Sequence, residues 1–262
     1  MADLTTPLDA PPQVRLKAKE VDKETQALYR RLFMRSVMVA GLVFALVNVV
    51  DSALPGGVGL SVTLALLSLP VTFVGYALVE GMLVQVVRDL HEDGDHQTSF
   101  ALTFRAAFAR LGPLVAVSLI TGFGVLVGML CLLIPGLVLL TRWAVALPVV
   151  MIEGRSARDA LVRSQQLVRG NSRAVFNVMI TVGILTGIVR LLFAVLGRGH
   201  GFVGLWLSST LAATLTVPYA AHAVTVLYYR LTEPERPVVL EPGKRWHSIW
   251  DAERAQTVHA ER

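Results

Sequence analysis

Residues Pro113–Ile134 read PLVAVSLITGFGVLVGMLCLLI, a run of apolar and small residues without one charged side chain. About 20 residues of α-helix cross the hydrocarbon core of a bilayer, so this run is long enough to span a membrane. A helix suits that environment because it satisfies its own backbone hydrogen bonds. Similar runs recur, and we place the expected spans at roughly Ser36–Leu54, Val58–Val79, Pro113–Ile134, Gly136–Ile152, Ala174–Leu196 and Phe202–Tyr229. The sequence therefore predicts an all-α fold, a polytopic membrane bundle of six transmembrane helices.

The composition agrees with a membrane protein. Of the 262 residues, 54% are hydrophobic and 16% are charged, and the mean hydropathy is +0.59. A soluble domain, in contrast, carries about a quarter charged residues. The N-terminal residues show no signal-peptide pattern, so we expect the first span to act as the insertion signal. The single cysteine, Cys131, excludes an intramolecular disulfide.

Positive charge lies on one side of the expected spans. Nearly all Lys and Arg residues fall in the N-terminal arm, the second and fourth loops and the C-terminal tail, whereas the loops on the other side hold only Arg198. By the positive-inside rule, both termini are expected in the cytoplasm. Because this distribution explains the net charge of +5, we expect membrane lipids, anionic ones above all, as partners and no nucleic acid.

Three parts are expected along the chain. They are a partly helical cytoplasmic N-terminal arm over residues 1–32, a six-helix transmembrane domain over residues 33–230 and a flexible cytoplasmic tail over residues 231–262. The transmembrane domain has the pattern of three repeated helix-pair units, each with a basic amphipathic segment followed by two spans. The clearest segments are Phe100–Leu111 and Ala157–Arg169, whose apolar residues share one helical face. We expect basic amphipathic interfacial helices there, with the apolar face in the membrane.

Small residues and prolines repeat in the same order. The odd spans carry pairs of small residues four apart, which permit close helix approach: Gly41/Ala45, Gly124/Gly128 and Gly183/Gly187. The even spans each carry a proline: Pro70, Pro148 and Pro218. The alternative explanation stays open, because Gly and Pro are frequent in membrane helices generally.

Basic residues of the amphipathic segments are the candidates for binding lipid headgroups. Ser156-x-x-Asp159 is typical of a helix start and Gly170 of a helix end, so the Ala157–Arg169 segment is a well-bounded helix. Arginine suits phosphate because its planar fork binds two oxygens. The candidates are Arg105, Arg110, Arg158, Arg163, Arg169 and Arg173.

Ionisable residues inside the spans are a second set of candidates, since burying them costs a few kcal/mol each. These intramembrane polar residues are Asp51, Glu80, Arg142, Arg190 and His222. Asp51, Arg142 and Arg190 are expected at similar depth in the outer half, where they either pair, hold a lipid phosphate, or extend to the headgroups. Glu80 and His222 are expected at similar depth in the inner half. They either pair, or Glu80 marks a span end while His222 makes one structural hydrogen bond.

Signals for an enzyme are absent from the sequence. There is no phosphate-binding glycine loop, no Gly-x-Ser-x-Gly elbow and no Cys-x-x-Cys pair. The loop His91-Glu92-Asp93-Gly94-Asp95-His96 is dense in potential metal ligands, but its spacing fits neither a helical zinc pair nor a calcium loop. We expect no catalytic residues, no metal and no cofactor.

The most distinctive stretch is Leu132–Arg173, LLIPGLVLLTRWAVALPVVMIEGRSARDALVRSQQLVRGNSR. Its motifs are Pro135-Gly136, Arg142-Trp143, Pro148, Glu153-Gly154, Arg163-Ser164 and Arg169-Gly170. The stretch resembles the bacterial family of the membrane domain of glycerophosphoryl diester phosphodiesterase, over most of Arg30–Arg230. The resemblance implies a six-helix bundle in a bacterial inner membrane, without the separate catalytic domain, whose His-Arg-Gly motif is missing here.

Two functions are consistent with these features. The first is a non-enzymatic inner-membrane protein that binds lipid headgroups or acts as a scaffold or accessory to a partner membrane protein. The second is a small transporter or permease that uses the intramembrane charged residues. A lipid-active membrane enzyme would need an acid–base or metal site, for which only the weak His91–His96 cluster qualifies.

Overall fold

The computed structural model describes residues 16–52, 58–93 and 99–232. All regular structure in these residues is helical, and six segments are long and apolar enough to cross a membrane. The prediction of an all-α multi-pass membrane protein is confirmed. The helices are α1 (Ala18–Ser52), α2 (Val58–Asp93), α3 (Phe100–Ala109), α4 (Leu111–Cys131), α5 (Leu133–Arg142), α6 (Ala146–Glu153), α7 (Ala157–Val168), α8 (Ser172–Gly197) and α9 (Gly201–Thr232).

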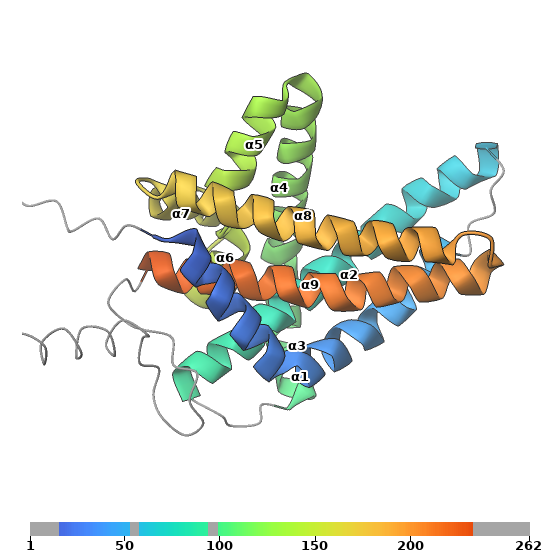
Figure 1. Ribbon diagram of the computed structural model, residues 1–262, viewed down its shortest axis with the longest axis horizontal. Coiled ribbons are helices and arrows are strands. Elements are labelled where there is room, and N and C mark those ends of the chain that lie inside the picture. Colours follow the sequence, from blue (N-terminus) through green and yellow to red (C-terminus); the bar gives the residue numbers. More distant parts are fainter. Residues whose placement is uncertain (1–15, 53–57, 94–98, 233–262) are drawn as a thin grey trace, which may run out of the picture.

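Helix α9 lies at the centre of the molecule. Its most extensive interface is with α1, followed by that with α8. In Figure 1, α8 and α9 run side by side, α1 crosses α9, and α4 and α5 form a hairpin that stands away from the α8–α9 pair. Most residues of α9 from Ala212 onward are buried, whereas α4 and α8 leave most of their apolar surface exposed. Such exposed apolar surface is what lipid covers in a membrane protein.

The first two helices are longer than the spans expected from hydropathy. Helix α1 runs without a break from Ala18, in the basic arm, to Ser52. Helix α2 continues past Glu80 to Asp93, as the extended apolar run indicates. Pro70 and Pro218 lie inside α2 and α9 without ending them.

The α4–α5 hairpin packs on its glycines. Its turn consists of Leu132 alone, so Pro135, which separates the expected spans Pro113–Ile134 and Gly136–Ile152, lies within α5. A Cβ atom on Gly128 would lie 2.9 Å from the Gly136 Cα atom, and one on Gly124 would lie 2.5 Å from the Trp143 ring. The two helices can approach so closely only because both positions lack a side chain.

The other two pairs of small residues behave differently. Gly41 of α1 faces Thr214 of α9, with 3.5 Å between a built Cβ atom and the Thr214 methyl carbon. Gly183 and Gly187 of α8 have nothing within 4 Å of such an atom. The three pairs therefore do not play one repeated packing role.

The fourth expected span is a broken helix. The α5 helix ends at Arg142 and α6 begins at Ala146, with a turn over residues 143–145. Pro148 favours the break, because it lacks an N–H group and its ring clashes with the carbonyl four residues earlier, that of Ala144. The break creates unpaired backbone groups in the middle of a membrane-spanning segment, where water cannot satisfy them.

Both amphipathic segments form helices, α3 and α7. The Ser156 side chain accepts a hydrogen bond from the Asp159 N–H at 3.3 Å and caps α7, and Gly170 follows its end with a φ of 95°. The predicted start and end are confirmed. The sequence predicts that the apolar face of α7 lies in the membrane. In the structure this face packs against α4, α5, α6 and α9 instead.

Helix α3 has a different apolar face. Its Phe100, Phe104 and Phe108 rings are exposed and stack in sequence, with centroids 6.3 Å and 5.8 Å apart. Thr103 and Ala107, which lie beside this row of rings, are buried, and α3 packs on α2. An exposed row of aromatic rings suits insertion into the membrane interface.

Candidate functional site

Ser164 of α7 occupies the break between α5 and α6. Its hydroxyl donates a hydrogen bond to the Arg142 carbonyl at 2.8 Å and accepts one from the Val145 N–H at 3.3 Å. The Ser164 side chain is fully buried. One hydroxyl thus satisfies an acceptor and a donor that the broken helix leaves without helical partners. Ser164 belongs to the Arg163-Ser164 motif and lies on the apolar face of the predicted Ala157–Arg169 helix, but its contact with the helix break was not predicted.

The end of α6 forms a charged corner with α7. The Glu153 carboxylate accepts hydrogen bonds from Arg163 at 3.3 Å, from the Tyr228 hydroxyl at 3.2 Å and from Arg155. Next to it, Gly154 has a φ of 70°, a conformation that ends helices and favours glycine. The Glu153-Gly154 motif therefore joins the end of α6 to both α7 and α9.

Arg110 lies beside Gly154 at the end of α6. Its guanidinium donates a hydrogen bond to the Val150 carbonyl at 3.0 Å, near the carbonyl end of α6. A Cβ atom on Gly154 would lie 2.5 Å from the Arg110 Nη1 atom, so the absent side chain makes room for the guanidinium. A cation at a helix C-terminus is favourable because it interacts with the unpaired carbonyls.

The structure divides the predicted headgroup-binding arginines into two groups. Arg110 and Arg163 bond to groups of the protein itself. The remaining residues are exposed: Arg105, Arg158, Arg169 and Arg173. Only this second group is free to meet a headgroup without first breaking an internal contact.

Arg142 and Arg173 come together at one cavity between α5 and α8. The cavity has a volume of about 560 Å³. Its polar lining includes both arginines, and its apolar lining includes Leu137, Val138 and Phe176. Neither guanidinium has a hydrogen bond or ion pair within the part of the chain that the structure describes. Two cations of different helices thus face a space with an apolar wall.

The start of α8 adds to the positive potential of this cavity. Ser172, the first residue of α8, lines it, and Asn171 before it makes no side-chain capping hydrogen bond. The N–H groups of a helix N-terminus carry partial positive charge and bind anions. The cavity therefore combines two guanidinium groups with a helix N-terminus.

The sequence predicts that Arg142 and Arg190 lie at similar depth, but the structure places them far apart. Arg173 and Arg190 are separated along α8 by about 25 Å at the helical rise of 1.5 Å per residue, and Arg142 adjoins the Arg173 end. The broken helix moves Arg142 to this end of the molecule. Asp51 lies in α1, but its side chain is outside the described part of the structure.

The remaining intramembrane polar residues occupy separate places. His222 is buried between α1 and α9, where its Nε2 atom is 3.2 Å from the Ser36 hydroxyl oxygen. Arg190 donates a hydrogen bond to the Thr216 hydroxyl at 3.2 Å and lies 5.9 Å from the Tyr76 ring centroid. Glu80 lines a different cavity, between α2 and α4. The described residues therefore do not bring Glu80 and His222 together as a pair.

One buried ion pair was not expected from the sequence. Glu24 of α1 accepts two hydrogen bonds from Arg230 of α9, and the exposed fractions of the two side chains are 3% and 12%. The residues lie 206 positions apart, so no local pattern signals the contact. The pair holds the basic arm against the end of α9 and leaves Arg230 unavailable to a headgroup.

Only part of the acidic and histidine loop lies within the described residues. Residues 94–98 lie outside the described residues, and His91 stacks on Tyr229 with ring centroids 4.0 Å apart. Within residues 16–52, 58–93 and 99–232, no three His, Cys, Asp or Glu side chains gather in a manner that could hold a metal ion.

Comparison with known proteins finds one family model that matches part of the chain. Residues 114–230 match the profile described as the membrane domain of glycerophosphoryl diester phosphodiesterase, which confirms the resemblance for this part of the chain. The match begins within α4 and includes α5 to α8 and nearly all of α9, and thus contains the break, Ser164 and the Arg142–Arg173 cavity. No curated protein and no solved structure matches the chain.

Proposed function

We propose that this multi-pass membrane protein, which carries the phosphodiesterase membrane domain over residues 114–230, is a non-enzymatic binder of anionic phospholipid. The cavity between α5 and α8 holds the headgroup. The observation that carries the proposal is that Arg142 and Arg173, from two helices, line this one cavity without protein partners among the described residues. We place the protein in a bacterial inner membrane with both termini in the cytoplasm, as the arginine distribution favours.

The chemistry of the cavity fits a phospholipid better than a soluble anion. Two guanidinium groups can hold the oxygens of a phosphate, each through a pair of hydrogen bonds. Leu137, Val138 and Phe176 provide an apolar wall along which an acyl chain can lie. A lipid thus satisfies both halves of the lining, whereas a free phosphate satisfies only one.

The other exposed arginines serve a less specific purpose. Arg158 lies on the exposed face of α7, Arg169 directly follows this helix, and Arg105 lies on α3. Each basic residue near an anionic membrane surface contributes about 1 kcal/mol of attraction. They draw anionic lipid to this side, while the cavity selects where a headgroup is held. A lipid held between α5 and α8 could also form part of the contact with a partner membrane protein.

The alternative function, a small permease, has less support. A broken helix is common in transporters, where its free backbone groups bind the substrate. Here Ser164 bonds to the backbone on both sides of the break. The intramembrane charged residues also fall in different places, with Glu80, Arg190 and Arg142 each lining a separate cavity. The Arg142 cavity shares no lining residue with the other two.

The proposal is tested by counting retained lipid on the purified full chain. The protein is delipidated in a neutral maltoside detergent, titrated with phosphatidylglycerol, and observed by native mass spectrometry. Arg142→Gln together with Arg173→Gln should weaken binding by about 2 kcal/mol, or about thirtyfold, because two headgroup contacts are lost. Glycerol 3-phosphate, which lacks acyl chains, should not displace the lipid at similar concentration.

A matched pair of substitutions controls for overall charge. Arg158→Gln together with Arg169→Gln removes the same charge from the exposed face of α7 and should change binding little at 0.3 M salt, since surface attraction is then screened over about 6 Å. Equal losses in both double variants would show diffuse surface attraction in place of a site. Unchanged binding in the folded cavity variant would refute the proposal.

A further inference from the structure

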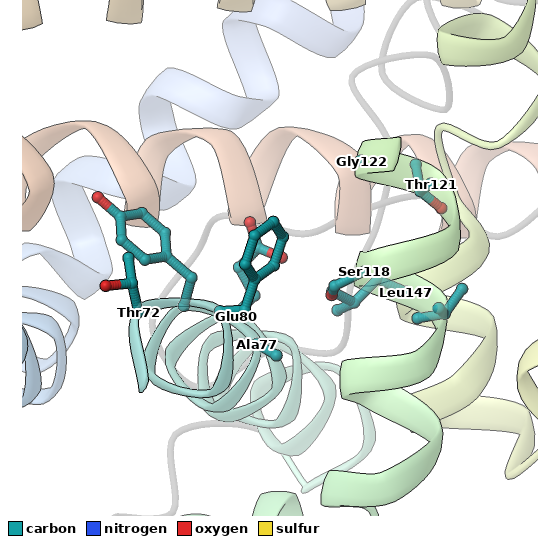
Figure 2. Close-up of a pocket in the computed structure, with 10 residues that line it drawn as sticks. Thr72, Ala77, Glu80, Ser118, Thr121, Gly122 and Leu147 are labelled. Atoms are coloured by element: carbon teal, nitrogen blue, oxygen red, sulfur yellow. The ribbon is translucent and has the colours of Figure 1, made fainter. Parts of the chain in front are cut away.

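A second cavity lies between α2 and α4, apart from the proposed lipid site. Its volume is about 380 Å³, within the range of small-molecule pockets, about 300–1,000 Å³. Figure 2 shows Glu80 and Ala77 on α2 facing Ser118 on α4, with Leu147 of α6 beside them. The lining combines two adjacent spans with the segment after the helix break. The lipid site, in contrast, is built by α5 and α8.

The lining has one charged residue in an otherwise uncharged pocket. Glu80 is that residue, and the aromatic residues Phe73 and Tyr76 lie on the same helix, on the same wall of the cavity. The rest of the lining consists of hydroxyl-bearing, small or aliphatic residues. A carboxylate beside aromatic rings is the combination that recognises an ammonium group, through charge and through cation–π attraction.

The Glu80 carboxylate has room for a ligand. No hydrogen bond or ion pair joins it to another described residue. Arg190 is near enough to attract it electrostatically, but the Arg190 guanidinium bonds to Thr216, lies over Tyr76 and does not line this cavity. A carboxylate in such surroundings carries a desolvation cost that a bound cation would reduce.

Ser118 provides a second unused polar group. Its hydroxyl oxygen is buried and has no hydrogen-bond partner among the described residues. In Figure 2 this oxygen points from α4 toward α2, the side on which Glu80 lies. Buried polar atoms in folded proteins are nearly always paired. An unpaired hydroxyl and a carboxylate on opposite walls indicate that a polar occupant belongs between them.

We infer that the cavity between α2 and α4 is a binding site for a small organic ammonium ion, held by Glu80 with Phe73 and Tyr76 against its apolar part. A hydrated metal ion fits the site less well, because the lining supplies a single carboxylate and is largely apolar. Metal sites for hard cations need several oxygen ligands. This inference is independent of the lipid site, since the two share no residue.

The Phe73 ring also forms one edge of the site. A Cβ atom built on Gly122 of α4 would lie 3.7 Å from this ring. The Phe73 ring of α2 therefore lies next to α4 at Gly122, and both residues line the cavity.

The test is isothermal titration calorimetry on the full chain in a neutral maltoside detergent, with benzyltrimethylammonium as the probe. A neutral detergent avoids the choline headgroups of phosphatidylcholine, which would compete. The probe should bind saturably, and Glu80→Gln should lower its affinity by at least about tenfold, because the charge partner is lost while the side chain keeps its shape. Glu92→Gln is the matched control and should leave affinity within twofold, since Glu92 lies on α2 in an exposed ion pair with Arg88.

A second variant keeps the carboxylate and changes the space. Ser118→Leu places an apolar side chain in the cavity and should also weaken binding by at least about tenfold. It tests the location even if Glu80→Gln fails to fold. Probe binding that survives both substitutions in folded protein, or that falls equally in Glu92→Gln, would overturn the inference. Absence of saturable binding to the wild-type chain would overturn it as well.

Discussion

Replacing Ser164 by alanine should destabilise the bundle at its break. The Ser164 hydroxyl bonds to the Arg142 carbonyl at 2.8 Å and to the Val145 N–H at 3.3 Å, and it is fully buried. Alanine removes a single oxygen and leaves almost no cavity, so packing changes little. Both backbone groups would then lie unpaired where water does not reach them.

The expected loss follows from the two bonds. Hydrogen bonds between side chains and neighbouring helices in membrane proteins average about 0.6 kcal/mol and reach about 1.7 kcal/mol. The 2.8 Å bond has ideal length and the 3.3 Å bond is long, so we assign them unequal shares. The free energy of unfolding should therefore fall by about 1–2 kcal/mol in Ser164→Ala.

The assay is reversible unfolding of the full chain in mixed micelles, by titration with sodium dodecyl sulfate. One of the four tryptophans lies in this region, since the Trp143 ring is in the turn between α5 and α6 and packs on Gly124, so tryptophan fluorescence includes a local signal. Gln165→Ala, on the exposed face of the same helix, is the control and should change the free energy by less than about 0.5 kcal/mol.

A loss in Ser164→Ala no larger than in the control would refute the reasoning. A further test combines Ser164→Ala with Pro148→Ala. If Pro148 causes the break, alanine at 148 regains an N–H for the Ala144 carbonyl and allows α5 and α6 to join. The loss caused by Ser164→Ala should then become smaller in the double variant, as a double-mutant cycle measures. Purely additive losses would argue against this explanation of the break.

Three further substitutions test other contacts. Gly154→Ala should lower the free energy of unfolding by about 1–2 kcal/mol, because the residue has a positive φ and its Cβ would meet the Arg110 guanidinium. The same unfolding titration measures this change, and an unchanged free energy would contradict the prediction. Glu24→Gln should lower the free energy of unfolding by about 3 kcal/mol, since Arg230 would lose its charge partner at a site where both side chains are nearly buried. Arg230→Gln should cause a similar loss, and the double variant should lose less than the sum of the two single losses. Gly128→Leu should separate the α4–α5 hairpin, because the side chain would collide with backbone 2.9 Å from its Cβ; a cysteine pair across the hairpin should then cross-link more slowly.

Membrane character and helix ends could be predicted because they depend on local features. The charge-free run from Pro113 to Ile134 needs only its own composition to be placed in lipid. The Ser156 cap and the stop at Gly170 depend on residues within one turn of each other, and both are confirmed. The Leu132–Arg173 motifs predicted a resemblance that the profile match confirms over residues 114–230.

Roles within those motifs could not be predicted, because they depend on contacts between helices. Arg110 and Arg163 have the same exposed amphipathic pattern as Arg158, yet they bond to the Val150 carbonyl and to Glu153. The depth of Arg142 changed for the same reason. Hydropathy counts residues along a continuous helix, whereas the turn over residues 143–145 interrupts it.

The sequence alone determined that the chain is an all-helical membrane protein with a basic side, because hydropathy, charge and capping act over a few residues. Tertiary structure alone decided which polar groups meet. It set Ser164 in the break, placed Arg142 beside Arg173, and left Glu80 facing Ser118 across a cavity. Such pairings join residues on different helices, and the relative position of two helices depends on packing along their whole length.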